Sequence, residues 1–195
     1  MIRLTECPFF TLLLSIILEN GRHVYFWRTV MDLRIKNKLA LVTGSTHGIG
    51  RAIAEALAVE GARVIVNGRK KTAVKDTVAS LSRHGEAHGV ISDLSTAEGA
   101  QNLLSETARL GPIDILVNNV GFFEVFLGKI APRLGKTVDD MRTAYFETTG
   151  AASLLQRFAA PEEIAAQVVF LCSERAAAIN GAAQRVDGGI IRSLF

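Results

Sequence analysis

The sequence predicts an α/β protein with a doubly wound parallel sheet that is incomplete, with about five strands and helices on both faces. Short continuous apolar runs alternate with amphipathic helical patterns between residues 39 and 117. A glycine-rich turn separates the first of these strands from the first helix. The 195 residues are enough for one domain of this class. Together these features are typical of a Rossmann-like fold.

The expected elements follow in regular order as far as residue 117. Strands are expected over 39–43, 63–67, 87–91 and 113–117. Helices are expected over about 49–60, over about 71–83, and from the capping-box pattern Ser95-Thr96-Ala97-Glu98 to near Arg109. The alternation then stops, and further helices are expected over 138–147 and from Pro161 onward, where two acids follow the proline. One last short strand is expected over 182–186.

Residues 1–30 differ from the rest and are interpreted as an N-terminal extension, with Met31 as the natural start. The apolar run from Phe9 to Leu18 is shorter than the about 20 helical residues that span a bilayer. No small-x-small cleavage site follows it, which argues against a signal peptide. A segment that touches a membrane is the alternative. Residues 31–195 are expected to form a single domain. Its parts are a nucleotide-binding half (31–121), a lid-like helical segment (122–160) and a C-terminal helix and strand (161–195).

Composition excludes several classes of function. A hydrophobic content of 49% and a charged content of 21% describe a folded globular chain. The net charge of +3 is small and scattered, which argues against a nucleic-acid partner. With four histidines and two distant cysteines, Cys7 and Cys172, the sequence predicts no metal site and favours a reducing, cytoplasmic compartment. Cys172 is expected in the core rather than as a nucleophile.

The glycine-rich turn Thr43-Gly44-Ser45-Thr46-His47-Gly48-Ile49-Gly50 is the first candidate binding element. A strand leads into it and a helix leaves it, so backbone N–H groups and a helix N-terminus face the space above the turn. Glycines there permit a tight turn and the close approach of a pyrophosphate. An ordinary strand–helix turn without a ligand is the alternative.

Several motifs at matching relative positions make this sequence resemble the short-chain dehydrogenase/reductase family. The resemblance covers residues 36–121 and about 150–195, and it implies NAD(P)-linked hydride transfer to or from a carbonyl or alcohol. The matching motifs are Thr43–Gly50, Asp93-Leu94, Asn118-Asn119-Val120-Gly121 (with Val where the family has Ala), Gln156-Arg157-Phe158, Pro161-Glu162-Glu163 and Val186-Asp187-Gly188-Gly189.

The resemblance, taken with the strand-end positions, implies a set of cofactor-binding residues. Asp93 follows a strand and is placed to accept a hydrogen bond from the adenine amine, or else to act only as a solvated acid at a helix N-terminus. The amides of Asn118 and Asn119 are expected to bridge strands or to touch ribose. The expected set is Gly44, Ser45, Thr46, His47, Gly48, Ile49, Gly50, Arg69, Asp93, Leu94, Asn118, Val120 and Gly121.

The choice of cofactor follows from the residues after the second strand. An acid there would bind the ribose 2′-OH of NAD. This chain instead has Asn67-Gly68-Arg69-Lys70-Lys71, in which three cations are available to a 2′-phosphate. His47 offers a further donor. The sequence therefore favours NADP(H) over NAD and favours Arg69 in particular, while Lys70 and Lys71 also suit a solvated helix start.

The catalytic motif of the family is missing from this sequence. The family uses Tyr-x-x-x-Lys with a serine, but here Tyr25 precedes Thr29 and Tyr145 precedes Thr149 by four positions. No catalytic residue is identified, and a missing internal segment is expected with its junction near Glu124. We therefore expect an oxidoreductase of impaired turnover on an unknown small-molecule substrate. The alternatives are a non-catalytic NADP-binding module and the inactive product of a truncated gene. An open sheet edge would favour a homo-oligomer formed through the C-terminal strand and helix.

Overall fold

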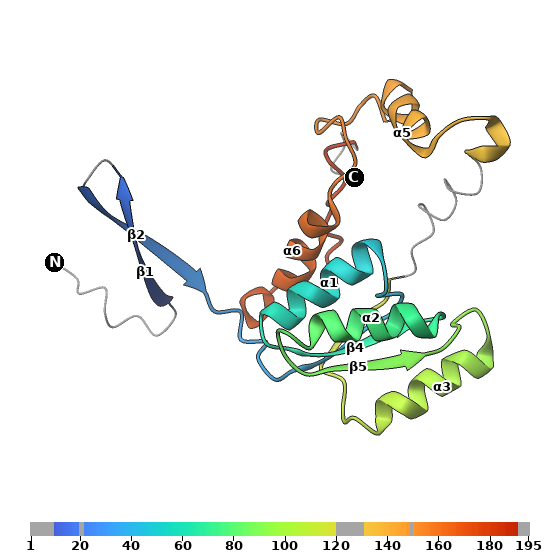
Figure 1. Ribbon diagram of the computed structural model, residues 1–195, viewed down its shortest axis with the longest axis horizontal. Helices are drawn as coiled ribbons and strands as arrows, with labels where there is room; N and C mark the ends of the chain where they lie inside the picture. The colour runs from blue at the N-terminus through green and yellow to red at the C-terminus, as the bar shows by residue number, and fades with distance from the viewer. Residues whose placement is uncertain (1–9, 20–21, 120–130, 149, 191–195) are drawn as a thin grey trace. The chain divides into compact units, whose positions relative to one another are not determined.

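The computed structural model describes residues 10–19, 22–119, 131–148 and 150–190 (Figure 1). The chain divides into two compact units, Met1–Arg34 and Ile35–Phe195. In the first unit β1 (Phe10–Glu19) pairs antiparallel with β2 (Arg22–Met31), with Phe10 opposite Met31. No strands were expected in this region. Both segments are rich in β-branched and aromatic residues, which favour an extended backbone.

The second unit is built on a parallel sheet of four strands, which confirms the predicted fold class. The spatial order is β5-β4-β3-β6, and each neighbouring pair is parallel. Val42 of β3 lies between Val66 of β4 and Val117 of β6, which fixes the register. The strands are β3 (Leu39–Val42), β4 (Arg63–Gly68), β5 (Ala87–Ile91) and β6 (Ile115–Val117).

Helices cover both faces of this sheet (Figure 1). Two of them, α1 (Gly48–Val59) and α2 (Lys71–Leu81), lie on one face, and α3 (Ala97–Ala108) lies on the other. The core under α3 is apolar and closely packed because buried residues of the strands meet buried Leu103 of the helix. Its members are Leu39, Leu41, Ile65, Val90 and Leu103.

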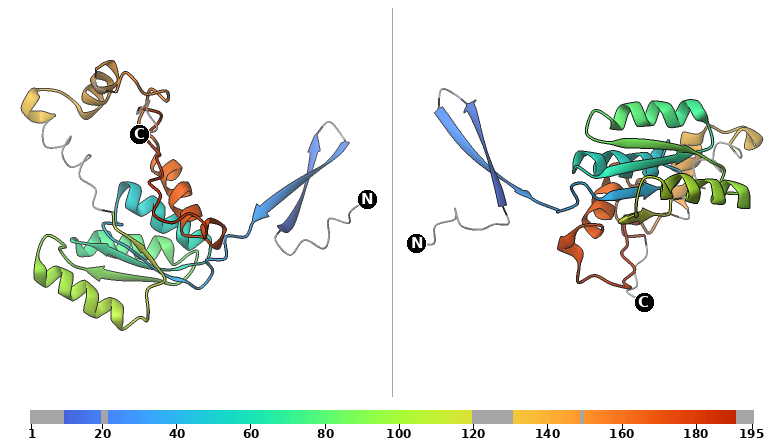
Figure 2. Two further views of the ribbon diagram at one scale, coloured as in Figure 1. Left: turned by 180° about the vertical axis from the view of Figure 1, so that it is seen from behind. Right: turned by 90° about the horizontal axis from the view of Figure 1, so that it is seen from below.

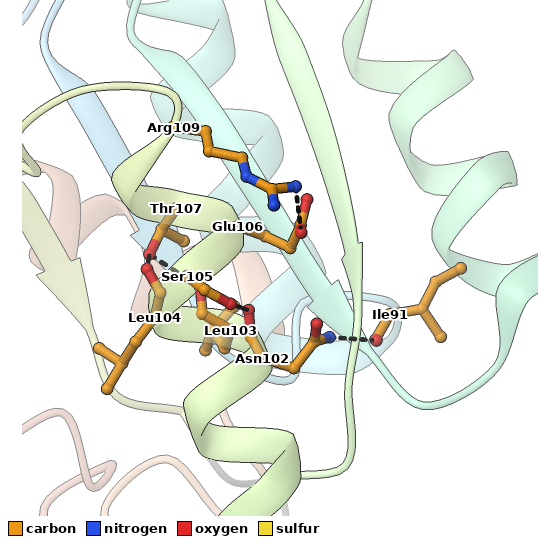
Figure 3. A network of polar contacts seen from close by, with 8 residues as sticks. All are labelled: Ile91, Asn102, Leu103, Leu104, Ser105, Glu106, Thr107 and Arg109. Carbon is orange, nitrogen blue, oxygen red and sulfur yellow. Dashed lines mark hydrogen bonds and ion pairs between the residues drawn. The ribbon is translucent and has the colours of Figure 1, made fainter.

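Polar contacts tie α3 to β5 and stabilise its last turns (Figure 3). The Asn102 amide donates to the Ile91 carbonyl at 3.2 Å. Glu106 and Arg109 form an ion pair of 2.6 Å on the exposed side. The helix begins one residue later than the predicted capping box, because the Thr96 hydroxyl, rather than that of Ser95, accepts from the Gly99 N–H. Ser95 is instead held by Asp93.

Two helices follow β6 in the described part of the chain, as predicted. α5 (Val138–Glu147) begins with a capping box in which Thr137 and Asp140 bond reciprocally. α6 (Pro161–Leu171) packs along α1, and both pictures show the two helices side by side (Figure 2). The Glu163 carboxylate accepts the Ala160 N–H at 2.7 Å at the start of α6. Short 3-10 turns cover Pro132–Leu134 and Glu174–Ala176.

The strand predicted over 182–186 does not form, so the sheet of the described residues has four strands rather than about five. Residues 182–186 are exposed and irregular. The glycine turn that follows them is bound elsewhere, because the Gly188 carbonyl accepts from the Leu155 N–H at 3.0 Å and from the Ser153 hydroxyl at 3.1 Å. Among the described residues, the segment 182–186 pairs with no strand of the sheet.

A charged cluster joins the first residues of β4 and β5. Arg63 donates to Glu86 at 2.8 Å, and His88 contacts the same carboxylate oxygen at 2.6 Å. The hydrogen bond from Arg63, followed by that from His88, lowers the pKa of Glu86 from 4.5 to about 2. Because the folded-state pKa is the lower one, this contact favours the folded state above pH 4.5. Its contribution is lost as the pH falls toward 2.

The substitution Arg63→Gln is expected to raise the pKa of Glu86 toward 4.5, because it removes the largest cause of the shift. Carbon-detected NMR titration of the glutamate carboxyls measures this directly. Arg109→Gln is the matched control, since Arg109 pairs with Glu106 instead. A Glu86 that titrates near 4.5 in the unaltered protein would contradict the prediction.

Candidate functional site

The glycine-rich turn after β3 is shaped by the close approach of Asn119. Gly44 has a φ of +59°, and a Cβ on it would lie 2.5 Å from the Asn119 carbonyl oxygen. A Cβ on Gly50 would collide with the Asn119 amide nitrogen and lie 2.6 Å from the Gly44 carbonyl oxygen. Gly48, with a φ of +54°, has nothing within 4 Å of a Cβ position, so its outer side is open. The turn is therefore tight on its protein side and open above Gly48.

Asn119 bridges two strands, which is one of the two roles expected for its amide. Its side-chain amide donates to the carbonyl oxygens of Thr43 and Gly44, both at 3.2 Å. Its backbone N–H donates to the Thr43 hydroxyl at 2.9 Å, and the Thr43 N–H donates to the Val117 carbonyl at 3.0 Å. These bonds close the turn against the end of β6.

Asn67 has a structural role that the sequence analysis did not assign to it. Its side chain is 2% exposed at the end of β4. The amide donates to the Ser92 hydroxyl at 2.8 Å and the Val90 carbonyl at 3.3 Å, and the amide oxygen accepts the Gly44 N–H at 3.4 Å. The sequence feature that could have indicated this role is the position of Asn67 as a polar residue directly after the apolar run 64–66.

Ser45 also serves the protein interior. Its side chain is fully buried, donates to the Val42 carbonyl at 2.7 Å and accepts the Asn67 N–H at 3.0 Å. The Ser45 N–H donates to the Asn67 carbonyl at 3.0 Å. Ser45 thus fixes the start of the turn against β4, and its hydroxyl does not face the open side above the turn.

A cavity of about 400 Å³ opens beside the turn and is lined by Thr46, His47, Arg69 and Lys70. The Thr46 hydroxyl lies 3.0 Å from Nδ1 of His47. The cavity therefore brings together three residues with cationic or imidazole groups from the turn and from the residues after β4. Such a lining suits an anionic group of the size of a phosphate.

The other predicted site residues lie at the same carboxyl edge of the sheet with different surroundings. Asp93 is half-buried after β5 and accepts from the Ser95 N–H at 3.0 Å and the Ser95 hydroxyl at 2.8 Å. These bonds, with a smaller effect of the Arg69 charge, lower the pKa of Asp93. Leu94 packs on the apolar core instead. Asn118 and Ile49 are exposed. Val120, Gly121 and the junction near Glu124 lie outside the described residues.

Tyr145 is the tyrosine of the predicted lid segment, and it belongs to an aromatic cluster. Its ring stacks on Phe158 at a centroid distance of 5.1 Å and meets Phe146 edge-on at 5.2 Å.

Burial raises the pKa of the Cys172 thiol, which disfavours the thiolate that a nucleophile requires. Among the described residues no group of three or more His, Cys, Asp or Glu side chains suits a metal ion. In those same ranges no helix is long and apolar enough to cross a membrane.

Comparison with known proteins agrees with this geometry. The family model described as short chain dehydrogenase matches residues 38–184. The chain belongs to the short-chain dehydrogenase family. Among its relatives in this family, the uncharacterized oxidoreductase YvrD of Bacillus subtilis is 33% identical, and the match covers 84% of this chain and 100% of YvrD. The 3-oxoacyl-[acyl-carrier-protein] reductase FabG of Aquifex aeolicus is 28% identical, with 82% and 100% covered.

Two solved structures share the fold of this chain. The L-sorbose reductase of Gluconobacter frateurii, complexed with NADPH and L-sorbose, matches with a TM-score of 0.69 and 24% identity. That match covers 84% of this chain and 100% of the reductase. The RhlG/NADP active-site complex of Pseudomonas aeruginosa matches with a TM-score of 0.64 and 22% identity, with 82% and 98% covered.

This chain is shorter than the short-chain dehydrogenases that it matches. The match to YvrD extends over 263 residues, whereas 84% of the 195 residues here is about 164. About 100 positions of that match therefore have no residue in this chain. YvrD itself is covered over its whole length, so the unmatched positions are internal to the match.

The substitution Asn67→Ala is expected to lower the free energy of unfolding by about 1–3 kcal/mol, because it leaves buried partners in β5 and the glycine turn unsatisfied. Urea unfolding followed by circular dichroism measures the change. Asn102→Ala is the control, since it removes a single exposed hydrogen bond to Ile91. A loss no larger than that of the control would show that Asn67 does not hold the strand ends together.

Proposed function

We propose that this short-chain dehydrogenase binds NADP(H) at the carboxyl edge of its sheet. The observation that carries the proposal is the cavity lined by Thr46, His47, Arg69 and Lys70, beside a strand end that has no acid. A carboxylate at that strand end would favour the 2′-OH of NAD, whereas cations favour a 2′-phosphate. The NADPH and NADP complexes of the two solved structures support the same choice.

Different residues of this chain bind different parts of the cofactor. Arg69 pairs with the 2′-phosphate, and Lys70 and His47 add positive charge or a donor beside it. The open side of Gly48 and the N-terminus of α1 receive the pyrophosphate. Ionised Asp93 accepts from the adenine amine, and exposed Asn118 contacts ribose. Bound there, the nicotinamide supplies the hydride acceptor or donor for an alcohol or carbonyl.

We propose further that turnover by this chain is impaired. Hydride transfer at a carbonyl requires a group that gives or takes a proton beside the oxygen. The sequence contains no Tyr-x-x-x-Lys, and Tyr145 stacks on Phe158 with a threonine four positions later. A non-catalytic NADP-binding module and an inactive product of a truncated gene are the other candidates. The cytoplasmic location, the extension over 1–30 and an oligomer formed through the C-terminal segment stay predictions.

NADPH is expected to raise the unfolding temperature of the purified chain more than NADH does, because ligand binding to the folded state stabilises it. Arg69→Ala is expected to weaken NADPH binding at least ~10-fold, since a charge-assisted bond contributes about 1.5–3 kcal/mol. The affinity for NADH should stay within about twofold of the unaltered protein. Differential scanning fluorimetry and calorimetric titration give the two readings.

The control for this experiment is Lys75→Ala, which removes an exposed cation of α2 that does not line the cavity. It should leave the preference for NADPH intact. Equal stabilisation of the unaltered protein by both nucleotides would refute the assignment of the 2′-phosphate to Arg69.

Turnover with a panel of small alcohols, ketones and sugars is expected to be about 10²–10⁴-fold below that of an intact family member, because a positioned general acid–base contributes about that factor. The absorbance of NADPH measures the rate, with the Gluconobacter L-sorbose reductase assayed alongside on L-sorbose. Rates comparable to the reductase on any substrate would disprove the impairment. Binding of NADPH without turnover favours the binding module.

A further inference from the structure

Gly68, the last residue of β4, is a glycine for lack of space. A Cβ on Gly68 would lie 2.6 Å from Cγ2 and 3.3 Å from Oγ1 of Thr46, and 3.2 Å from Cγ2 of Val74. Its φ lies outside the left-handed region, so the backbone itself would accept other residues. The constraint comes from a residue of the glycine-rich turn, Thr46, which packs over the strand end.

The groups around Gly68 are held in place from several directions. Val74 is 2% exposed inside α2 and also approaches Gly89 of β5. Thr46 is β-branched, so its χ1 angle is restricted. Its hydroxyl lies 3.0 Å from Nδ1 of His47. The preceding Ser45 donates its N–H to the Asn67 carbonyl and accepts the Asn67 N–H with its hydroxyl. The space at Gly68 therefore cannot be opened by a small movement of one flexible side chain.

We propose that Thr46 and Gly68 form a specificity-determining pair for the cofactor. This inference rests on the proposed binding of NADP(H). A carboxylate at the end of this strand is the group that selects NAD, and it requires a Cβ in the space that the Thr46 methyl group fills. Thr46 thereby excludes the acid, and it also lines the cavity that contains Arg69. Thr46 therefore disfavours the binding of NAD and lines the site that would bind the 2′-phosphate of NADP(H).

The pair predicts a non-additive change of cofactor preference. Gly68→Asp alone should lower the unfolding temperature and bind neither nucleotide tightly, because its Cβ meets Thr46. The double variant Thr46→Ala/Gly68→Asp should regain the unfolding temperature. It should bind NADH at least ~10-fold more tightly than the unaltered protein and NADPH at least ~10-fold more weakly, about 1.4 kcal/mol for each tenfold change. Calorimetric titration of all four proteins gives the cycle.

Uncharged partners separate packing from charge. Gly68→Ala places the same Cβ against Thr46 and should lower the unfolding temperature. Combination with Thr46→Ala should remove that loss and leave the weak affinity for NADH unchanged. If Gly68→Ala lowers the unfolding temperature equally with Thr46 and with Thr46→Ala, Thr46 does not limit the space at position 68.

Two binding results would overturn the inference while leaving the proposed function intact. The first is Gly68→Asp that binds NADH as tightly as the double variant, and the second is a double variant that still prefers NADPH. In both cases the unaltered protein binds NADPH. An unaltered protein that binds neither nucleotide would instead refute the proposed function, and the selectivity of the pair with it.

Discussion

The hydrogen bonds of two asparagines hold the carboxyl ends of four strands together, and the candidate site depends on them. Asn67 links β4 to Ser92 and Val90 of the adjoining β5 segment and receives the Gly44 N–H, while Asn119 links β6 to Thr43 and Gly44. Each of these bonds joins segments that are more than twenty residues apart in the sequence. The glycine-rich turn is therefore shaped by its neighbours as much as by its own glycines.

The same principle explains why small residues recur at this edge of the sheet. Gly44 and Gly50 leave room for Asn119, and Gly68 leaves room for Thr46. At Gly50 and Gly68 a side chain of another segment occupies the space that a Cβ would need, and at Gly44 the backbone carbonyl oxygen of Asn119 occupies it. Close packing of this kind is what turns a family motif into a cavity of a particular charge and shape.

Local pattern was sufficient to predict the elements that bury a continuous apolar face. The four strands and the helices α1, α2, α3 and α6 form near their expected bounds. The helix α5 has no buried residue, and its predicted start is instead marked by the capping box at Thr137. The segment 182–186 has a suitable sequence, but a strand also needs a neighbour, and pattern alone does not show that the following turn binds Ser153 and Leu155. Similarly, sequence named Thr46 and Arg69, whereas the buried bonds of Asn67 and the contact of Thr46 with Gly68 arise only in three dimensions.

The candidate site is built from one continuous part of the chain, and this has a consequence for the order in which it is synthesised. Every described residue of the candidate site lies between Thr43 and Asn119, ahead of α5 and α6. Ribosomes add about 5–20 residues per second, and domains generally fold as units. The described residues of the candidate site are therefore synthesised before α5 and α6. A chain that ended before Ile115 would lack the strand that closes the turn. One that ended after Asn119 would keep that strand but lack α6, which packs along α1.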